Sequence, residues 1–160
     1  MKVRRKYPSR PLVGAGAVVH RGNRALLIKR RYPPNEGKWA LPGGLVDLGE
    51  RVQDAAAREV LEETGLRVQV EGLLDVGTDI HFDRDSKLEY HYVLVDYVAR
   101  PVGGRLRLNA ESSDHGWFSA VEFKNLEMSE GTREVLELYF ANWSDSAKRS
   151  AGRPTGMRSS

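Results

Sequence analysis

The sequence predicts an α/β fold in which a mixed sheet lies between helices. Two observations predict it. Short apolar strands, one helix, further strands and a second helix follow one another along the chain, and glycines and prolines separate them. The 160 residues, 40% of them hydrophobic and without an internal repeat, suffice for one domain with its own core.

The first predicted unit is a hairpin. Residues 12–20 and 24–29 are apolar and rich in β-branched side chains, and residues 21–23 (RGN) form the turn between them. Residues 30–38 are a loop, because two prolines and a glycine interrupt them. Residues 39–44 (WALPGG) then lead into the first helix.

That helix is predicted to run from about Arg51 to Thr64. Gly65 is well placed as the left-handed residue that ends it. A strand over residues 67–76 follows, and residues 79–87 form a polar, hairpin-like connection.

Residues 88–100 form the strongest predicted strand, since they are rich in Tyr and Val. Residues 101–104 turn the chain and residues 105–108 form a short strand. A loop over 109–114 precedes a short apolar run at Trp117-Phe118.

Two helical segments complete the fold. Ser119 caps a short helical turn that extends through Asn125, and residues 129–143 form the second long helix. Its apolar face consists of Val135, Leu136, Leu138, Tyr139 and Trp143. We therefore expect a single domain over residues 1–143 and a flexible basic tail over 144–160.

Acidic side chains occupy an unexpected face of the first helix. At roughly 100° per residue, its apolar stripe consists of Val52, Ala55, Ala56 and Val60. Glu59 and Glu63 fall within the same arc, and Glu62 lies at its edge. Two carboxylates are thus predicted to point inward.

Clustered carboxylates repel one another, and the free-energy cost grows when they are buried. A hard divalent cation, Mg²⁺ or Mn²⁺, offsets that repulsion and binds carboxylate oxygens. The alternative is an acidic helix face exposed to solvent. The inward placement, the Gly65 terminator and the Gly43-Gly44 pair favour the metal.

The whole stretch of residues 44–66, GLVDLGERVQDAAAREVLEETGL, resembles the signature box of the Nudix hydrolases. The fixed positions of that box are filled by Gly44, Glu50, Arg58, Glu59, Glu62, Glu63 and Gly65, with Val60 and Leu66 in the two apolar positions. Flanking features extend the resemblance to roughly residues 11–142.

The resemblance implies a Nudix-type α/β/α sandwich with a mixed, partly closed β-sheet. It also implies that Glu59 and Glu63 are the primary ligands of Mg²⁺, with Mn²⁺ as a substitute. Glu62 shares a further metal, and the Gly44 carbonyl adds a backbone oxygen.

Arg58 and Glu50 are implied to have a supporting role. In the family the arginine pairs with the earlier box glutamate and holds the loop against the helix, with Glu50 near an outer metal. We therefore count Arg58 both among the catalytic residues and, with Glu50 and Gly65, as support of the site.

The general base remains open between three acids. Glu111 lies six residues before Trp117, which is similar to the family's Glu-before-Trp arrangement. Asp114 and the box residue Glu62 are its rivals. Both loop acids are also compatible with plain solvent exposure.

Cationic and aromatic groups for a substrate precede the box. Lys29, Arg30 and Arg31 end a predicted strand just before the glycine-rich approach, and a guanidinium binds phosphate oxygens in a bidentate manner. Tyr32 is a candidate for stacking on a base. Phe82 and Tyr90 are alternatives.

Composition excludes several classes of protein. Without cysteine there is no disulfide, thiolate or zinc–sulfur chemistry. No apolar run approaches the ~20 residues that span a bilayer, and no secretory-type apolar region follows the basic N-terminus, so we expect a cytoplasmic protein. The two ends are basic, but no motif indicates a nucleic-acid partner.

The predicted function is metal-dependent hydrolysis of a pyrophosphate bond in a nucleoside diphosphate linked to another moiety. Residues 30–50 and 91–104 most resemble ADP-ribose pyrophosphatases, which would give AMP and ribose 5-phosphate. One subgroup of these enzymes carries a proline about fifteen residues beyond the box, where this chain has His81.

Other functions within the same family stay open. They are a house-cleaning nucleoside triphosphate pyrophosphohydrolase and a dinucleoside polyphosphate hydrolase. A Nudix module that senses a nucleotide without cleaving it is a third alternative, and the complete box argues against it. By analogy with the family, the chain is a candidate homodimer.

Overall fold

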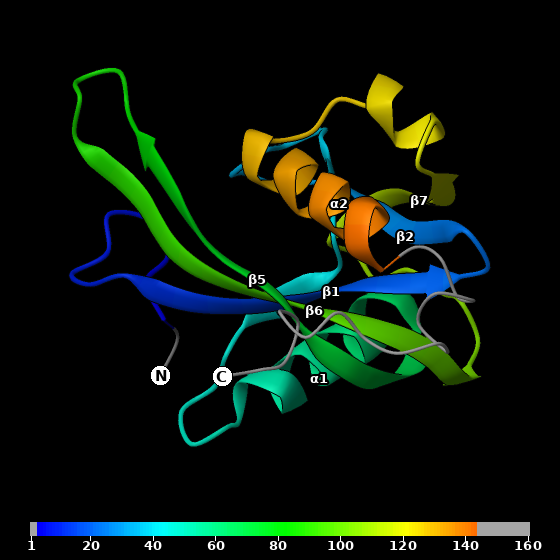
Figure 1. Ribbon diagram of the computed structural model, residues 1–160. Helices are drawn as coiled ribbons and strands as arrows, with labels where there is room; N and C mark the ends of the chain where they lie inside the picture. The colour runs from blue at the N-terminus through cyan, green and yellow to red at the C-terminus, as the bar shows by residue number, and fades with distance from the viewer. Residues whose placement is uncertain (1–2, 144–160) are drawn as a thin grey trace.

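The computed structural model describes residues 3–143, and the predicted tail at 144–160 lies outside the described residues. The elements are β1 (Leu12–Arg21), β2 (Arg24–Arg30), β3 (Trp39–Ala40), β4 (Gly43–Leu45), α1 (Val52–Thr64), β5 (Leu66–Phe82), β6 (Leu88–Gly104), β7 (Ser112–Ser119), the 3₁₀ helix η1 (Glu122–Asn125) and α2 (Glu130–Asn142). Figure 1 shows the helices α1 and α2 on opposite sides of the strands.

The sheet is mixed, as the sequence predicted. β1 is its centre: it pairs in parallel with β6, from Leu12 opposite Tyr92 to Val19 opposite Ala99, and antiparallel with β2 and β4. β5 extends the sheet beyond β6, and β3 and β7 pair with β2. Within residues 3–143 the path ends at β3 and β5, so the sheet does not close into a barrel.

Each helix buries its apolar side against one face of the sheet. Ala55 and Ala56 of α1 pack with Ala15, and Val60 packs with Ala17 and Val19. On the other face, a larger cluster joins α2 to the strands; it includes Val18, Leu27, Val98, Val135, Leu136, Tyr139 and Trp143. Leu138, predicted in the same face of α2, packs at its margin.

The strands β5 and β6 form an arm that leaves the body of the sheet, with the N-terminal segment beside it (Figure 1). Both strands are longer than the sequence predicted. β5 includes residues 79–82, which the sequence predicted to lie in the connection, and only residues 83–87 turn. β6 runs through the predicted turn at 101–104, because its pairing with β5 continues to Gly104.

Two further local predictions were wrong. Residues 105–108 do not form a strand; instead Arg105 and Arg107 donate backbone hydrogen bonds to Gly65 and Thr64 at the end of α1. β7 begins at Ser112, inside the predicted loop, because it pairs with β2 along its whole length. Tertiary hydrogen bonds, absent from a local pattern, decide both segments.

The predicted helix ends agree with the structure. Gly65 ends α1 with φ 76°, and its N–H donates to Leu61. Ser129 caps α2 by accepting from the Thr132 N–H, and Ser119 accepts from the Glu122 N–H at η1. Neither helix of the described chain has the length and apolar content that crossing a membrane requires.

Candidate active site

The glycine pair before α1 lets the backbone approach the helix. Gly43 and Gly44 lie in β4, paired with Gly16 and Ala15 of β1. A Cβ atom on Gly43 would stand 2.6 Å from the Ala15 carbonyl oxygen, and one on Gly44 would collide with the Glu59 carboxyl group. Glycine at 43 therefore allows the close pairing of β4 with β1, and glycine at 44 leaves room for the Glu59 carboxyl group against this strand.

Glu63 is the most deeply buried acid of the box. Its exposed fraction is 3%, and one carboxylate oxygen accepts the Gly43 N–H at 2.9 Å. Burial raises the pKa of Glu63 to about 8, against the opposing effect of that N–H, and the charges of Glu59 and Glu111 raise it further. The helical periodicity that pointed Glu63 inward is thus confirmed.

Arg58 links the preceding loop to α1. Its guanidinium donates to both carboxylate oxygens of Glu50, at 2.7 and 2.9 Å, and to the Leu45 carbonyl at 3.0 Å. Asp47 lies 3.4 Å from the same group. The hydrogen bonds from Arg58, and one from the Asp47 N–H, lower the pKa of Glu50 to about 2. The predicted Arg58–Glu50 pair is present as a bidentate ion pair.

The same guanidinium also reaches two acids of the helix. Its Nη1 atom is 2.9 Å from a Glu59 oxygen and 3.2 Å from both Glu62 oxygens. Burial raises the pKa of Glu59, and Arg58 opposes the rise. The Glu62 side chain is 53% exposed, so it lies at the edge of the inward face, as its position on the helix predicted.

The donor set fits a hard divalent cation. In residues 3–143, no three His, Asp or Glu side chains already converge in a metal-binding arrangement, since Arg58 stands between Glu59 and Glu62. Two largely buried carboxylates nevertheless adjoin the Gly43-Gly44 backbone with raised pKa values, which marks negative charge without full compensation. Glu59, Glu63 and the Gly44 carbonyl are the groups that would hold such a cation.

Glu111 comes close to this cluster from another part of the chain. Its charge acts on both Glu59 and Glu63. The Arg31 N–H donates to the Glu111 carbonyl at 3.0 Å, which fixes this loop beside the end of β2. The rival Asp114 lies further along β7, opposite Lys29, where it is exposed and accepts the N–H of His115.

Of the four predicted substrate residues, Arg30 is brought nearest to the carboxylates. Its charge lowers the pKa of Glu63, and its Nε donates to the Pro34 carbonyl at 2.7 Å. The Lys29 ammonium lies 6.0 Å from the centre of the Trp39 ring. Arg31 and Tyr32 are exposed, and Arg31 donates to the Ser112 carbonyl.

Comparison with known proteins identifies the family. The NUDIX domain model matches residues 10–139. The chain belongs to the Nudix family. The recognition made from the box is therefore confirmed.

Three relatives illustrate how this Nudix chain compares. An ADP-ribose pyrophosphatase of Methanocaldococcus jannaschii is 36% identical over 108 residues, which are 68% of this chain and 62% of that enzyme. A MutT-like protein of Streptomyces ambofaciens is 33% identical, over 83% of this chain and 76% of its own length. The crystal structure of a MutT Nudix hydrolase from Burkholderia pseudomallei has a TM-score of 0.68 at 36% identity, and the match covers 81% of this chain and 98% of that one.

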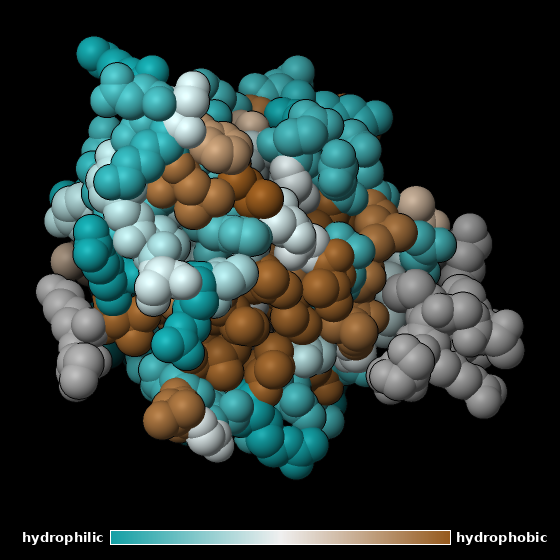
Figure 2. All heavy atoms as spheres, turned by 90° about the vertical axis from the view of Figure 1, so that its left-hand side faces the viewer, coloured by the Kyte–Doolittle hydropathy of each residue, from teal (hydrophilic) through white to brown (hydrophobic). Residues whose placement is uncertain are grey.

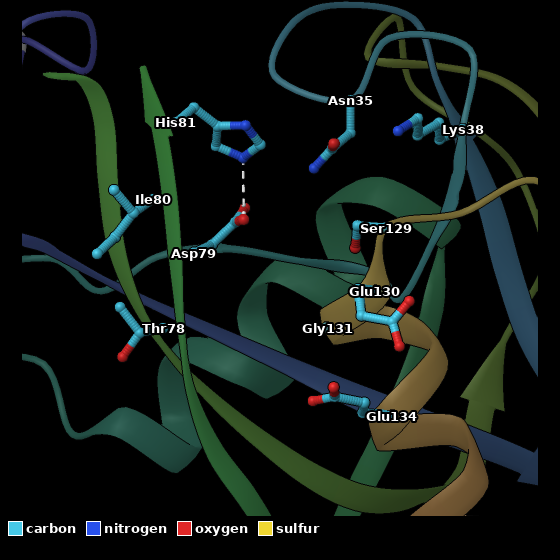
Figure 3. A pocket seen from close by; sticks show the side chains of 10 residues that line it. All are labelled: Asn35, Lys38, Thr78, Asp79, Ile80, His81, Ser129, Glu130, Gly131 and Glu134. Carbon is cyan, nitrogen blue, oxygen red and sulfur yellow. Dashed lines mark ion pairs between the residues drawn. The ribbon is translucent and has the colours of Figure 1, made fainter. Parts of the chain in front are cut away.

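The structure contains a cavity on the α2 side of the sheet, away from the box carboxylates. A cavity of about 550 Å³ is bounded by the β5 arm, the loop before β3 and the start of α2 (Figure 3). It is lined by Asn35, Lys38, Thr78, Asp79, Ile80, His81, Ser129, Glu130, Gly131 and Glu134. His81 Nε2 lies 2.9 Å from Asp79 Oδ1. No periodic pattern in the sequence predicts this cavity, because its walls come from segments that meet only in the folded chain.

Sequence reasoning also missed a buried acid outside the box. Asp96 of β6 is 9% exposed and lies opposite Asp75 of β5. Burial raises the pKa of Asp96 to about 7, and the charge of Asp75 adds to the rise. A single aspartate within the strongly apolar run VLVDYV was the signal that could have found it.

Proposed function

We propose that the chain hydrolyses the pyrophosphate bond of a nucleoside diphosphate linked to another moiety, with ADP-ribose split into AMP and ribose 5-phosphate. The observation that carries the proposal is the buried pair Glu59 and Glu63 against the Gly43-Gly44 backbone. A divalent cation would offset the charge of this cluster, and a cation beside a backbone edge suits a pyrophosphate.

The choice of ADP-ribose rests on similarity. The archaeal relative named above is an ADP-ribose pyrophosphatase, and residues 30–50 and 91–104 resemble that subgroup. From its composition, we propose the cytoplasm as the compartment.

The residues of the site have distinct roles in this reaction. Bound Mg²⁺ would neutralise the pyrophosphate and make a water more acidic. Glu111 accepts the proton of the water that attacks phosphorus, the bridging P–O bond breaks, and the leaving phosphate takes the electron pair. Arg30 holds a phosphate oxygen, and Arg58 keeps Glu59 in place through contacts with both Glu50 and Glu59. Positioning and charge compensation thus supply most of the rate enhancement.

Replacing Glu63 tests the cluster. Glu63→Gln keeps the shape and the Gly43 contact but removes the charge that would hold the cation, so we expect at least a hundredfold loss of kcat. The measurement is product release from ADP-ribose, other nucleotide sugars, NADH, diadenosine polyphosphates, and normal and oxidised nucleoside triphosphates, each with Mg²⁺ or Mn²⁺.

Glu130 is an exposed acid outside the box. Glu130→Gln is therefore the control variant and should keep the wild-type kcat. Preference for a triphosphate would retain the mechanism and reject ADP-ribose as substrate. Wild-type turnover by Glu63→Gln would reject the metal assignment itself.

A pair of variants tests the base. Glu111→Gln should lower kcat by about 10² to 10⁴-fold, the usual range for a general base, with little change in Mg²⁺ affinity. Asp114→Asn is the matched control in the same strand region. Glu111 is not the base if both variants lose the same fraction of kcat, or if a high Mg²⁺ concentration restores the kcat of Glu111→Gln.

We also propose that the chain is a homodimer joined at the open edge of β5. Within residues 3–143 no strand pairs with that edge, and the β5–β6 ladder is regular from Asp75 to His81. The outer face of β5 exposes Val76, Ile80 and Phe82, and Figure 2 shows apolar side chains gathered on this side of the molecule. Antiparallel pairing of two copies about Thr78 would set Val76 opposite Ile80 of the second copy, so apolar contact also favours a second copy as the occupant.

A further inference from the structure

The N-terminal strap, residues 3–10, is fastened to the β5–β6 arm. The Tyr7 hydroxyl donates to Asp83 at 2.6 Å, and the Tyr7 N–H donates to the Glu89 carbonyl at 2.8 Å. Lys6 forms an ion pair with the Glu89 carboxylate at 3.0 Å, and the Lys87 ammonium lies 4.6 Å from the centre of the Tyr7 ring. Four contacts to the tip of the arm give the strap a defined course.

This course brings Arg5 to the carboxylate cluster. Arg5 and Val3 line a cavity of about 600 Å³, whose other walls are residues 45–48 and Glu59. Arg5 forms no ion pair with any residue in 3–143, in contrast to its neighbour Lys6. A guanidinium is thus held beside a candidate metal ligand without a partner carboxylate of its own.

Tyr92 is a second polar group within reach of the Arg5 guanidinium. Its side chain is 7% exposed, and its hydroxyl is buried with no hydrogen-bond partner of good geometry among the described residues. Burial raises the pKa of Tyr92, while the nearby Arg5 and Arg30 guanidinium groups oppose the rise. Arg30 also acts on Glu63, so its charge links the Tyr92 hydroxyl to the box carboxylates, while Arg5 shares a cavity wall with Glu59.

We infer that Arg5, Arg30 and Tyr92 form an anion subsite that binds a phosphoryl oxygen of the substrate beside Glu59 and Glu63. Guanidinium groups donate in pairs to phosphate oxygens, and a buried hydroxyl whose O–H has no acceptor gains a strong one when an oxyanion binds. The subsite deepens the proposed function and rests on it for the identity of the anion. Arg5 acts in it as a substrate-binding residue that the strap delivers.

The charge of the N-terminus alone does not distinguish Arg5 from its neighbours. Arg4 directs its Nε to the Lys6 carbonyl at 3.0 Å, away from any carboxylate of the box, and it does not line the cavity. Arg4 therefore serves as a matched control: the same side chain, one residue earlier, in the same strap.

The test compares Arg5→Gln with Arg4→Gln. Binding of inorganic pyrophosphate in the presence of Mg²⁺ is measured by calorimetry, and KM and kcat are measured with ADP-ribose. We expect Arg5→Gln to weaken pyrophosphate binding and raise KM by about tenfold to a hundredfold, the effect of one charged hydrogen bond, with a small change in kcat. Arg4→Gln should match the wild type.

Loosening the strap supplies an independent measurement. Tyr7→Phe removes the hydrogen bond to Asp83, so it should raise KM in the same direction, and its effect should be less than additive with that of Arg5→Gln. Tyr92→Phe should also weaken pyrophosphate binding.

The outcomes separate the subsite from the proposed reaction. If both Arg5→Gln and Arg4→Gln bind pyrophosphate as tightly as the wild type, the subsite is rejected. If Arg5→Gln weakens pyrophosphate binding and the wild type hydrolyses nothing in the substrate panel, the subsite stands and the proposed function fails. Fully additive effects of Tyr7→Phe and Arg5→Gln would reject delivery by the strap.

Discussion

At the scale of single residues, the chain contains buried carboxylates with different partners. Glu63 has a backbone donor and faces Arg30 and a cluster that a cation can complete. Asp96 lies opposite Asp75 instead, in the sheet, where Gly16 allows it close to the backbone of β1. Burial opposes ionisation of both acids, but only the first belongs to the Nudix box.

The raised pKa of Asp96 predicts a dependence of stability on pH. An acid whose pKa is higher in the folded state binds its proton more tightly there, so folding is favoured below the unfolded value of 3.8. The free energy of unfolding should fall as pH rises from 3.8 to about 7 and stay reduced above it. The change corresponds to about 4 kcal/mol at most, since one pKa unit is about 1.4 kcal/mol.

Asp96→Asn should remove this dependence. We expect the variant to be more stable than the wild type at pH 8 and close to it at pH 4, in urea unfolding followed by circular dichroism. Asp85→Asn, in the exposed turn of the arm, is the control. If the free energy of unfolding of Asp96→Asn depends on pH in the same way as that of the wild type, the raised pKa of Asp96 is contradicted.

At the scale of elements, the ends of the helices were more predictable from local sequence than the ends of the strands. Gly65 is required by its positive φ and by the Arg105 carbonyl that would meet a Cβ atom there, so the end of α1 was predictable. The ends of β5 and β6 were not, because each strand continues for as long as its partner offers hydrogen bonds. Polar residues of the arm, such as Asp79 and His81, form strand as readily as the apolar ones.

The open edge of β5 makes the dimer testable. Ile80→Lys places a charge in the centre of the proposed contact, where it would be buried without a partner, and should yield a monomer. Val121→Lys, a similar change at an exposed site outside the arm, is the control and should leave the dimer intact.

Size-exclusion chromatography with light scattering measures the outcome. The wild type should have twice the 18.0 kDa mass of one chain, and Ile80→Lys should have that mass once. A wild type of 18.0 kDa at micromolar concentration would reject the β5 contact.

At the scale of the whole molecule, the candidate site is assembled from distant parts of the chain. The loop and helix of the box supply the acids, the end of β2 supplies Arg30, the start of β7 brings Glu111, and the strap brings Arg5. The single domain expected over residues 1–143 stays a prediction. The layers seen in residues 3–143, a mixed sheet with helices on its two faces, agree with it.

The sequence by itself determined the family, the helix that carries the acids and the inward direction of Glu59 and Glu63. These follow from fixed spacing and a period of 3.6 residues, which are local properties of one segment. Tertiary structure alone decided which of Lys29, Arg30 and Arg31 acts on the carboxylates, that Glu111 approaches them, and that Arg5 of the strap shares a cavity with Glu59. Those proximities depend on strand pairing and on the course of the strap, and contacts between residues far apart in the chain leave no periodic trace in it.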